Sequence, residues 1–349
     1  TNGKDIVSFV TYDNMGRNDV SSYLPYVDNK TDSVFRTNPI SDQRTYHVTK
    51  YGLGEGYYSY ARKTYDNSPL GLVLSTNAPG TSGYQYPTTY QYRLNSAADA
   101  IKVYRIENNT LKLQGTYPAE TLTVKGSASR WSTSDTTQQR VLEYTDSKGR
   151  IIATETIVSS SDRRRTYYVY DELGRQRYVI PPALDAKLTA ESYSCTDPML
   201  LKLGYYTEYD EYGNPVKEYV PGAGYTHYLY DKRFRLVFTQ SAKQREGNKW
   251  SFTKYDIFDR PVISGICTGT AASLQAQLDA QTVFGEERSS ATGNLHGYTN
   301  LTCPTNVGAN DYLIITYYDT YGFTTNAALN FNSDWCFGQA RSNNIIGLT

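Results

Sequence analysis

Short β-forming runs alternate with polar turns along most of the chain. Runs rich in β-forming residues occupy positions 178–180, 216–220, 236–238 and 262–263, and each run follows a turn that contains Asp, Gly or Asn. Runs of this kind that are bounded by turn residues predict strands joined in hairpins. Three runs stop at Pro25, Pro181 and Pro221, because proline cannot donate to a sheet ladder. The pattern predicts an all-β fold with minor α, built from antiparallel hairpins.

The turns themselves repeat. The 35 tyrosines and 22 aspartates of this 349-residue chain would adjoin about twice by chance, but Tyr-Asp occurs seven times, and an eighth, degenerate unit runs from Tyr144 to Arg150. Two units read Tyr-Asp-x-x-Gly-Arg in full. The candidate repeat residues are Tyr12, Asp13, Gly16, Arg17, Tyr65, Asp66, Tyr144, Asp146, Gly149, Arg150, Tyr170, Asp171, Gly174, Arg175, Tyr209, Asp210, Gly213, Tyr230, Asp231, Tyr255, Asp256, Arg260, Tyr318, Asp319 and Gly322.

Each position of the unit has a physical reason. The Asp carboxylate can accept backbone N–H groups two residues on, and Gly supplies the positive φ that the loop needs near its end. The Arg stem can lie over a neighbouring Tyr ring while its guanidinium stays hydrated. One unit has Phe234 where the others have Gly, and because a bulky residue at positive φ is costly, we expect that turn to be of another type.

These units resemble the YD repeats of the bacterial RHS/YD-repeat family, which includes insecticidal toxin complex shells and is related to teneurins. The similarity spans roughly residues 5–325 and includes longer motifs in the same order. These motifs are Tyr23-Leu24-Pro25-Tyr26-Val27, residues 35–40, Ser68-Pro69-Leu70, residues 219–224, Tyr230-Asp231-Lys232-Arg233 and residues 252–256.

The resemblance implies a curved, spiralling antiparallel sheet that forms part of a hollow shell around a C-terminal toxin. The partners that it implies are the rest of the same polypeptide shell and its C-terminal effector. Many family shells end in an aspartyl protease segment, but Asp197-Pro198 is followed by Met199 in mid-chain and does not match that signature. We therefore carry over no protease residue.

Spacing and composition suggest two regions. Residues 1–137 hold widely spaced units with long insertions, including an expected exposed loop at 76–90, and residues 138–349 hold the tightly spaced units. The boundary is soft, and the two regions are expected to form one continuous sheet. Residues 121–137, which are rich in Ser and Thr, are expected to cross between sheets. Leucines four apart predict short helices over 271–281 and 182–191.

Charge and hydropathy exclude several classes of protein. Lys plus Arg and Asp plus Glu are 35 each, so the chain lacks the net positive charge of a nucleic-acid binder. The absence of a stretch of 18 apolar residues argues against membrane insertion. The chain begins Thr1-Asn2-Gly3 without an apolar leader, which predicts a piece of a longer or processed polypeptide, secreted or displayed at the bacterial cell surface by an unidentified route.

No constellation of residues predicts catalysis, a metal or a cofactor. His47, His227 and His296 are scattered along the chain. Cys195, Cys267, Cys303 and Cys336 lack metal-type spacing, and the sequence is compatible with either buried free thiols or disulfides. The glycines of residues 52–56 are followed by a strand-like Tyr pattern, which favours a flexible turn over a phosphate loop. Turn capping explains the Asp residues better than calcium binding.

The sequence therefore predicts a non-enzymatic structural segment of a shell that encapsulates or displays an effector. Open sheet edges would invite self-association. The alternative is a cell-surface binding module that recognises glycan or protein through a Tyr-rich sheet face, although such rows of tyrosine also fill a sheet's own surface.

Overall fold

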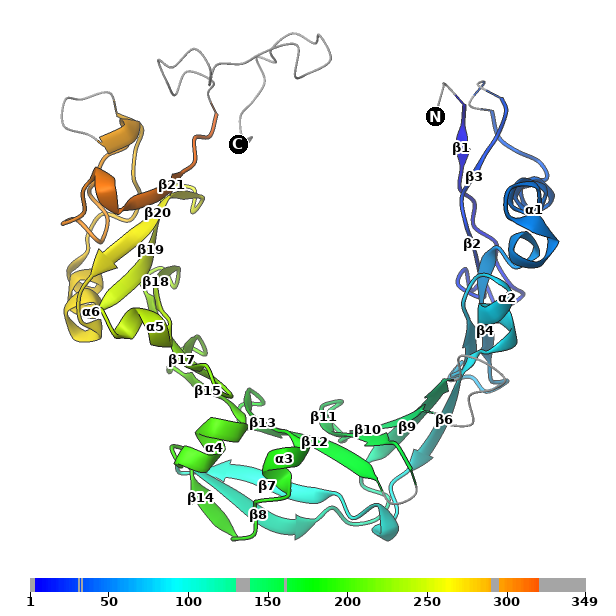
Figure 1. Ribbon diagram of the computed structural model, residues 1–349, viewed down its shortest axis with the longest axis horizontal. Helices are drawn as coiled ribbons and strands as arrows, with labels where there is room; N and C mark the ends of the chain where they lie inside the picture. Colours follow the sequence, from blue (N-terminus) through cyan, green and yellow to red (C-terminus); the bar gives the residue numbers. More distant parts are fainter. Residues whose placement is uncertain are drawn as a thin grey trace. The chain divides into compact units, whose positions relative to one another are not determined.

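The computed structural model describes residues 4–319, except for residues 31, 33, 130–138, 160, 161 and 290–294. Its main sheet has sixteen strands in the order β2-β4-β5-β6-β9-β10-β11-β12-β13-β15-β16-β17-β18-β19-β20-β21, so neighbours in the sheet are close neighbours in the sequence (Figure 1). Neighbouring strands of this sheet, such as β10 with β11 and β19 with β20, pair in antiparallel fashion. The predicted antiparallel β fold with minor α is confirmed.

The chain divides into two compact units. The first comprises residues 1–171 and 179–194, and the second comprises residues 172–178 and 195–349. The strands of the first unit are β1 (Ile6–Val7), β2 (Ser21–Tyr23), β3 (Tyr26–Val27), β4 (Tyr60–Tyr65), β5 (Val73–Asn77), β6 (Thr88–Leu94), β7 (Lys102–Glu107), β8 (Thr110–Thr116), β9 (Thr123–Ser129), β10 (Gln139–Thr145), β11 (Ile151–Ile157), β12 (Arg163–Tyr170) and β14 (Ser192–Ser194). Its helices are α1 (Pro39–Tyr57), α2 (Thr81–Gln85), α3 (Pro182–Asp185) and the 3₁₀ turn η1 (Ala97–Asp99).

In the second unit the strands are β15 (Tyr205–Tyr209), β16 (Pro215–Val220), β17 (Gly224–Tyr230), β18 (Leu236–Gln240), β19 (Lys249–Tyr255), β20 (Pro261–Thr268) and β21 (Tyr312–Ile315), and β13 (Gln176–Ile180) begins in it. Its helices are α4 (Pro198–Leu203), α5 (Ala242–Arg245), α6 (Ala271–Ala280), η2 (Leu295–Gly297) and η3 (Ala309–Asp311). Helix α5 packs against β17 and β19, and helix α6 packs against β17 (Figure 1). The core beneath them gathers Phe238, Trp250, Phe252, Leu274 and Leu278, which are all buried.

Two small sheets in the first unit interrupt the sequence of hairpins. Strands β1 and β3 pair with each other, and β14, β8 and β7 form a three-stranded sheet. The segment with β7 and β8 is an insertion, because β6 pairs directly with β9. The predicted boundary at 137/138 lies outside the described residues, and β9 and β10 on its two sides pair with each other.

The two predicted helices have different outcomes. The prediction over 271–281 is confirmed by α6, whose N-cap Thr270 forms a capping box with Ser273. The prediction of a helix over 182–191 is wrong in its length, because helix α3 ends at Asp185. Beyond it, the N–H groups of Thr189 and Ala190 donate to the Tyr193 hydroxyl, and not to carbonyls one helical turn back.

The predictions for three connecting segments need correction. Residues 52–56 form the end of helix α1 and no turn, and the strand begins only at Tyr60. Gly52 breaks this helix with φ of 84°, and a side chain at Gly56 would overlap the backbone of His47. The supposed loop at 76–90 contains α2 and the first residues of β6, and the supposed crossover at 121–137 begins with strand β9.

Candidate functional site

Aspartate closes the hairpin turns through the same set of hydrogen bonds in successive units. At Asp146, carboxylate oxygen Oδ1 accepts the N–H groups of Lys148 and Arg150, both at 2.9 Å. The Asp146 N–H donates to the Arg150 carbonyl at 2.9 Å, and Gly149 donates back to the Asp146 carbonyl at 3.0 Å. Equivalent bonds close the turns that begin at Asp13, Asp210, Asp231 and Asp256. The repeated aspartates thus hold the turn backbone directly.

The electrostatics of these aspartates follow from the bonds. Burial acts to raise the pKa of Asp146, but the backbone and side-chain donors of Arg150 outweigh it and leave the pKa below its ordinary value. The pKa of Asp13 is also lowered, chiefly by the backbone N–H of Arg17. The carboxylate form is therefore the one that the folded turn selects.

The position before the arginine adopts positive φ in every described unit. Gly16, Gly149, Gly174 and Gly213 have φ between 77° and 92°. Phe234 has φ of 61° in the same place and donates to the Asp231 carbonyl at 2.9 Å as the glycines do. The prediction that this turn is of another type is wrong. The turn bonds of Asp231 impose the left-handed conformation even on phenylalanine, at a steric cost of about 1–2 kcal/mol.

Arginine links each hairpin to the next one. Arg150 bonds Asp146 of its own turn through Nε and Nη2, at 2.9 and 2.7 Å, and its guanidinium lies 4.9 Å from the centre of the Tyr170 ring in the following unit. The same arrangement joins Arg17 to Tyr65, Arg175 to Tyr209, Arg235 to Tyr255 and Arg260 to Tyr318, with separations of 4.1–5.0 Å.

The tyrosine hydroxyl completes the connection. Tyr170 donates to the carbonyl of Ile151, the residue directly after Arg150, at 3.0 Å. The corresponding bonds run from Tyr209 to Gln176, Tyr230 to Pro215, Tyr255 to Leu236 and Tyr318 to Pro261, at 2.7–3.2 Å. We call this combination of Asp–Arg pair, Arg–Tyr stacking and Tyr hydroxyl bond the inter-hairpin staple. It places the repeated side chains of the motif at the seam between successive hairpins.

Replacing Tyr170 with phenylalanine tests the hydroxyl bond of one staple. We expect the free energy of unfolding of the first unit to fall by about 0.5–1.5 kcal/mol, because the Ile151 carbonyl loses its donor while the ring stays in place. Urea unfolding followed by circular dichroism measures the change. Tyr12→Phe is the matched control, since the Tyr12 ring is 69% exposed. Equal losses in the two variants would contradict the staple.

Several predicted repeat residues depart from this pattern. Asp66 sits in a longer turn, where it accepts the Leu72 N–H, and no arginine occupies that position. In the Tyr209 hairpin Asn214 replaces arginine and bonds Asp210 through its amide at 2.9 Å. Asp319 accepts a bond from Arg260. Gly322 and Cys336 lie outside the described residues.

Sequence reasoning missed three features of the structure. Tyr92 donates to the Val73 carbonyl at 3.1 Å and so occupies the staple position after the Tyr65 hairpin, although no Asp follows it. Arg36 is buried among Asp5, Asp28 and Asp32 near the N-terminus. Lys254 and Glu286 form a fully buried ion pair. Tyr92 carried a detectable signal, the β-former Tyr at a hairpin interval. The bond of Arg36 to Asp5 and the pair of Lys254 with Glu286 each join residues more than 30 positions apart, which the sequence does not mark.

The residues considered for catalysis or metal binding stay apart. Among the described residues, no group of three His, Cys, Asp or Glu side chains could hold a metal ion. His47 bonds the Pro25 carbonyl, His227 packs between Tyr225 and Trp250, and His296 lies near Tyr312. Cys195, Cys267 and Cys303 are buried free thiols, and burial raises the pKa of Cys267 to about 12. No described helix is long and apolar enough to span a membrane.

Tyrosine rows fill the sheet surface. The rings of Tyr178 and Tyr206 stack at 4.5 Å, and Tyr219 and Tyr225 continue the row at 5.6 and 5.0 Å. Tyr178 and Tyr206 are almost completely buried, and the Tyr178 hydroxyl donates to the Cys195 carbonyl. Burial raises the pKa of Tyr206 to about 12. This row therefore packs the protein's own interior.

A family described as a domain of unknown function (DUF6443) matches residues 1–94. No curated protein matches the chain. Among solved structures, the crystal structure of TcdB2-TccC3-TEV is 17% identical with a TM-score of 0.43, covering 75% of this chain and 10% of that chain. TcdB2-TccC3 without its hypervariable C-terminal region is 18% identical with a TM-score of 0.45, covering 77% of this chain and 11% of that chain. This chain thus spans about a tenth of the length of those chains.

Proposed function

We propose that this chain is a non-enzymatic structural segment of a bacterial RHS/YD-repeat shell, which in the complete protein encapsulates or displays a C-terminal effector. The observation that carries the proposal is the inter-hairpin staple. Each staple joins the Asp–Arg pair and a backbone carbonyl of one hairpin to a tyrosine of the following hairpin. A further hairpin can therefore be added without changing the earlier ones. Repetition of this contact produces a sheet that can be extended by any number of hairpins.

The sheet ends support the same role. In the described part of the chain, β2 and β21 are the terminal strands of the main sheet, and each has a sheet neighbour on one side. Leu313 and Ile314 of β21 are mostly exposed. Strand edges of this kind accept further strands. The partners that we propose for them are further hairpins of the same polypeptide, or a second copy where those hairpins are missing. We also propose that the complete protein is exported to the cell surface or secreted into the medium.

Protection of the effector by the complete protein tests the function. The parent gene is read beyond residue 349, the full-length protein is expressed, and trypsin digestion of the downstream domain is followed by mass spectrometry. We expect the domain to be protected in the wild type and digested faster in the triple variant Arg150→Ala, Arg235→Ala, Arg260→Ala, which weakens three staples.

Arg164→Ala is the control for the triple variant, because Arg164 lies on the surface and bonds only the nearby Asp162 among the described ion pairs. A gene with no downstream domain would refute the proposal. So would a downstream domain that is digested at one rate whether it is attached to the repeats or produced alone.

A further inference from the structure

Phe234 is not explained by the turn in which it lies. It adopts the left-handed conformation that four other units give to glycine, and its own turn bonds would form equally well with glycine. Its ring is not needed by the core either, because the side chain is 53% exposed. A bulky residue kept in strained backbone points to a use for its side chain.

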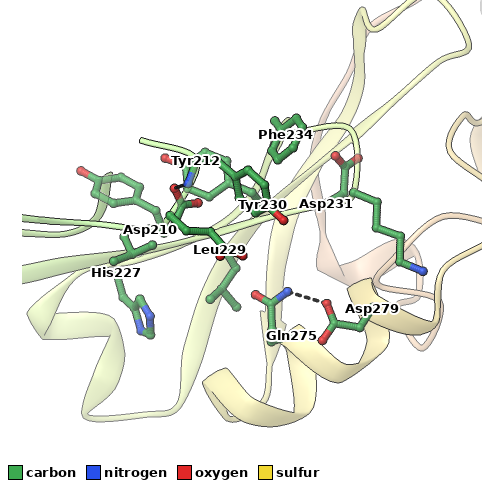
Figure 2. Close-up of a pocket in the computed structure, with 13 residues that line it drawn as sticks. Asp210, Tyr212, His227, Leu229, Tyr230, Asp231, Phe234, Gln275 and Asp279 are labelled. Carbon is green, nitrogen blue, oxygen red and sulfur yellow. Dashed lines mark hydrogen bonds between the residues drawn. The ribbon is translucent and has the colours of Figure 1, made fainter. Parts of the chain in front are cut away.

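The ring of Tyr212 lies beside it. Tyr212 comes from the turn of the preceding hairpin, is 68% exposed, and its ring centre is 4.8 Å from that of Phe234, with the planes inclined by 54°. The two rings line one side of a cavity of about 650 Å³ within the second unit. Both rings belong to the aromatic part of the lining (Figure 2).

Helix α6 supplies polar groups on another side of the same cavity. Gln275 and Asp279 lie one helical turn apart, and the Gln275 amide donates to the Asp279 carboxylate at 2.9 Å (Figure 2). This bond holds two planar groups in a fixed arrangement that offers both hydrogen-bond donors and acceptors. The cavity therefore combines aromatic lining residues with an organised amide–carboxylate pair.

The charged residues that line the cavity are mostly acidic, with Asp210, Glu211, Asp231 and Asp279 against Lys232. The carboxylates of Asp210 and Asp231 are occupied by their own turns. Glu211, Asp279 and Lys232 remain as charged lining residues, and this set lacks the cluster of cations that a polyanion would require. A neutral ligand that has both apolar faces and many hydroxyl groups fits this lining best.

We propose that this cavity binds a neutral saccharide of one or two pyranose rings, with Tyr212 and Phe234 as the stacking platform and Gln275 and Asp279 as hydroxyl partners. The volume lies within the range of natural small-molecule sites, about 300–1,000 Å³. The C–H face of a pyranose contacts the aromatic rings, and its hydroxyls bond the amide and carboxylate. The cavity borders staple residues such as Tyr230 and Asp231, but the four residues proposed to bind the sugar make no staple bond, so the proposal does not rest on the shell function.

Isothermal titration with maltose, cellobiose, lactose and N,N′-diacetylchitobiose, each at millimolar concentration, tests the site. We expect saturable binding of at least one disaccharide by the wild-type chain. Phe234→Gly should weaken it at least tenfold while leaving Tm unchanged or raised by about 2–4 °C, because glycine relieves the left-handed strain. Gln275→Ala should also weaken binding.

Phe258→Ala is the matched control. Phe258 is 70% exposed in the turn of the next hairpin but does not line this cavity, so its loss should leave binding unchanged. The proposal is overturned if none of the disaccharides saturates the wild type, if Phe234→Gly binds as well as the wild type, or if choline or a heparin disaccharide saturates the cavity in place of the neutral sugars. None of these results would alter the staples.

Discussion

Replacing Lys254 with alanine is expected to lower the free energy of unfolding of the second unit by about 3–5 kcal/mol. The Lys254 ammonium lies 3.1 Å from Glu286 Oε1, and neither side chain is exposed to solvent. It also donates to the Asn300 side chain and to the Thr302 carbonyl. The variant leaves the Glu286 charge buried without its counter-ion, which is the costly state for such a pair.

The surroundings of Glu286 explain why the pair persists. Burial alone would raise the pKa of Glu286, but the charge of Lys254 and donors from Thr299, Leu301 and Thr302 outweigh it, so the pKa is lowered. Burial lowers the pKa of Lys254. The pair and its hydrogen bonds fix Glu286, Asn300 and Thr302 against Lys254 of strand β19, and the loss in the variant should therefore include local loosening around these three residues.

Urea unfolding followed by the fluorescence of the buried Trp250 measures the effect. Lys217→Ala is the matched control, because Lys217 forms a partly exposed pair with Glu208 at 3.2 Å, and pairs of that kind contribute about 0–1 kcal/mol. The double variant Lys254→Met, Glu286→Leu should recover part of the loss, since it removes both charges together. A loss no larger than that of Lys217→Ala would show that the pair is not a structural anchor.

Local chemistry made the hairpins predictable. The turn bonds of Asp146 connect residues within four positions, so the Tyr-Asp-x-x-Gly-Arg pattern carries them in full. The same reasoning found the strands that follow each turn. It also indicated that arginine could lie over a tyrosine, but the sequence did not show which tyrosine, because that depends on the register between successive hairpins.

Features that depend on distant contacts could not be predicted. Lys254 and Glu286 are 32 residues apart, and nothing in the sequence marks either as buried. Phe234 contradicts the ordinary preference for glycine at positive φ, since the bonds of Asp231 decide the conformation there. Helix α1 lacks a clear apolar stripe and contains glycines, so its residues 52–56 resembled a turn. The Lys254–Glu286 pair thus depends on distant contacts, whereas at Phe234 the turn bonds of Asp231 override the preference of the residue itself.

Replacing Asp231 with alanine is expected to destabilise the second unit by about 3 kcal/mol. The Asp231 side chain is completely buried, accepts the N–H groups of Arg233 and Arg235, and pairs with the Arg235 guanidinium at 2.6 Å. Removing it leaves two turn N–H groups without their acceptor and releases an arginine that is only 10% exposed. Arg235 keeps its bonds to Asp259 and Phe284, which limits the loss.

The matched control is Asp210→Ala in the preceding hairpin. Asp210 makes the same two backbone bonds, but its partner at the arginine position is the uncharged Asn214. The difference between the two variants in urea unfolding therefore isolates the ion pair and the staple that it supports. We expect Asp231→Ala to lose more stability and to loosen the contact between Arg235 and Tyr255, which nuclear Overhauser effects at the Tyr255 ring would report. Equal losses would mean that the aspartates act through the turn backbone alone, with no contribution from the Arg–Tyr contact to the joint between hairpins.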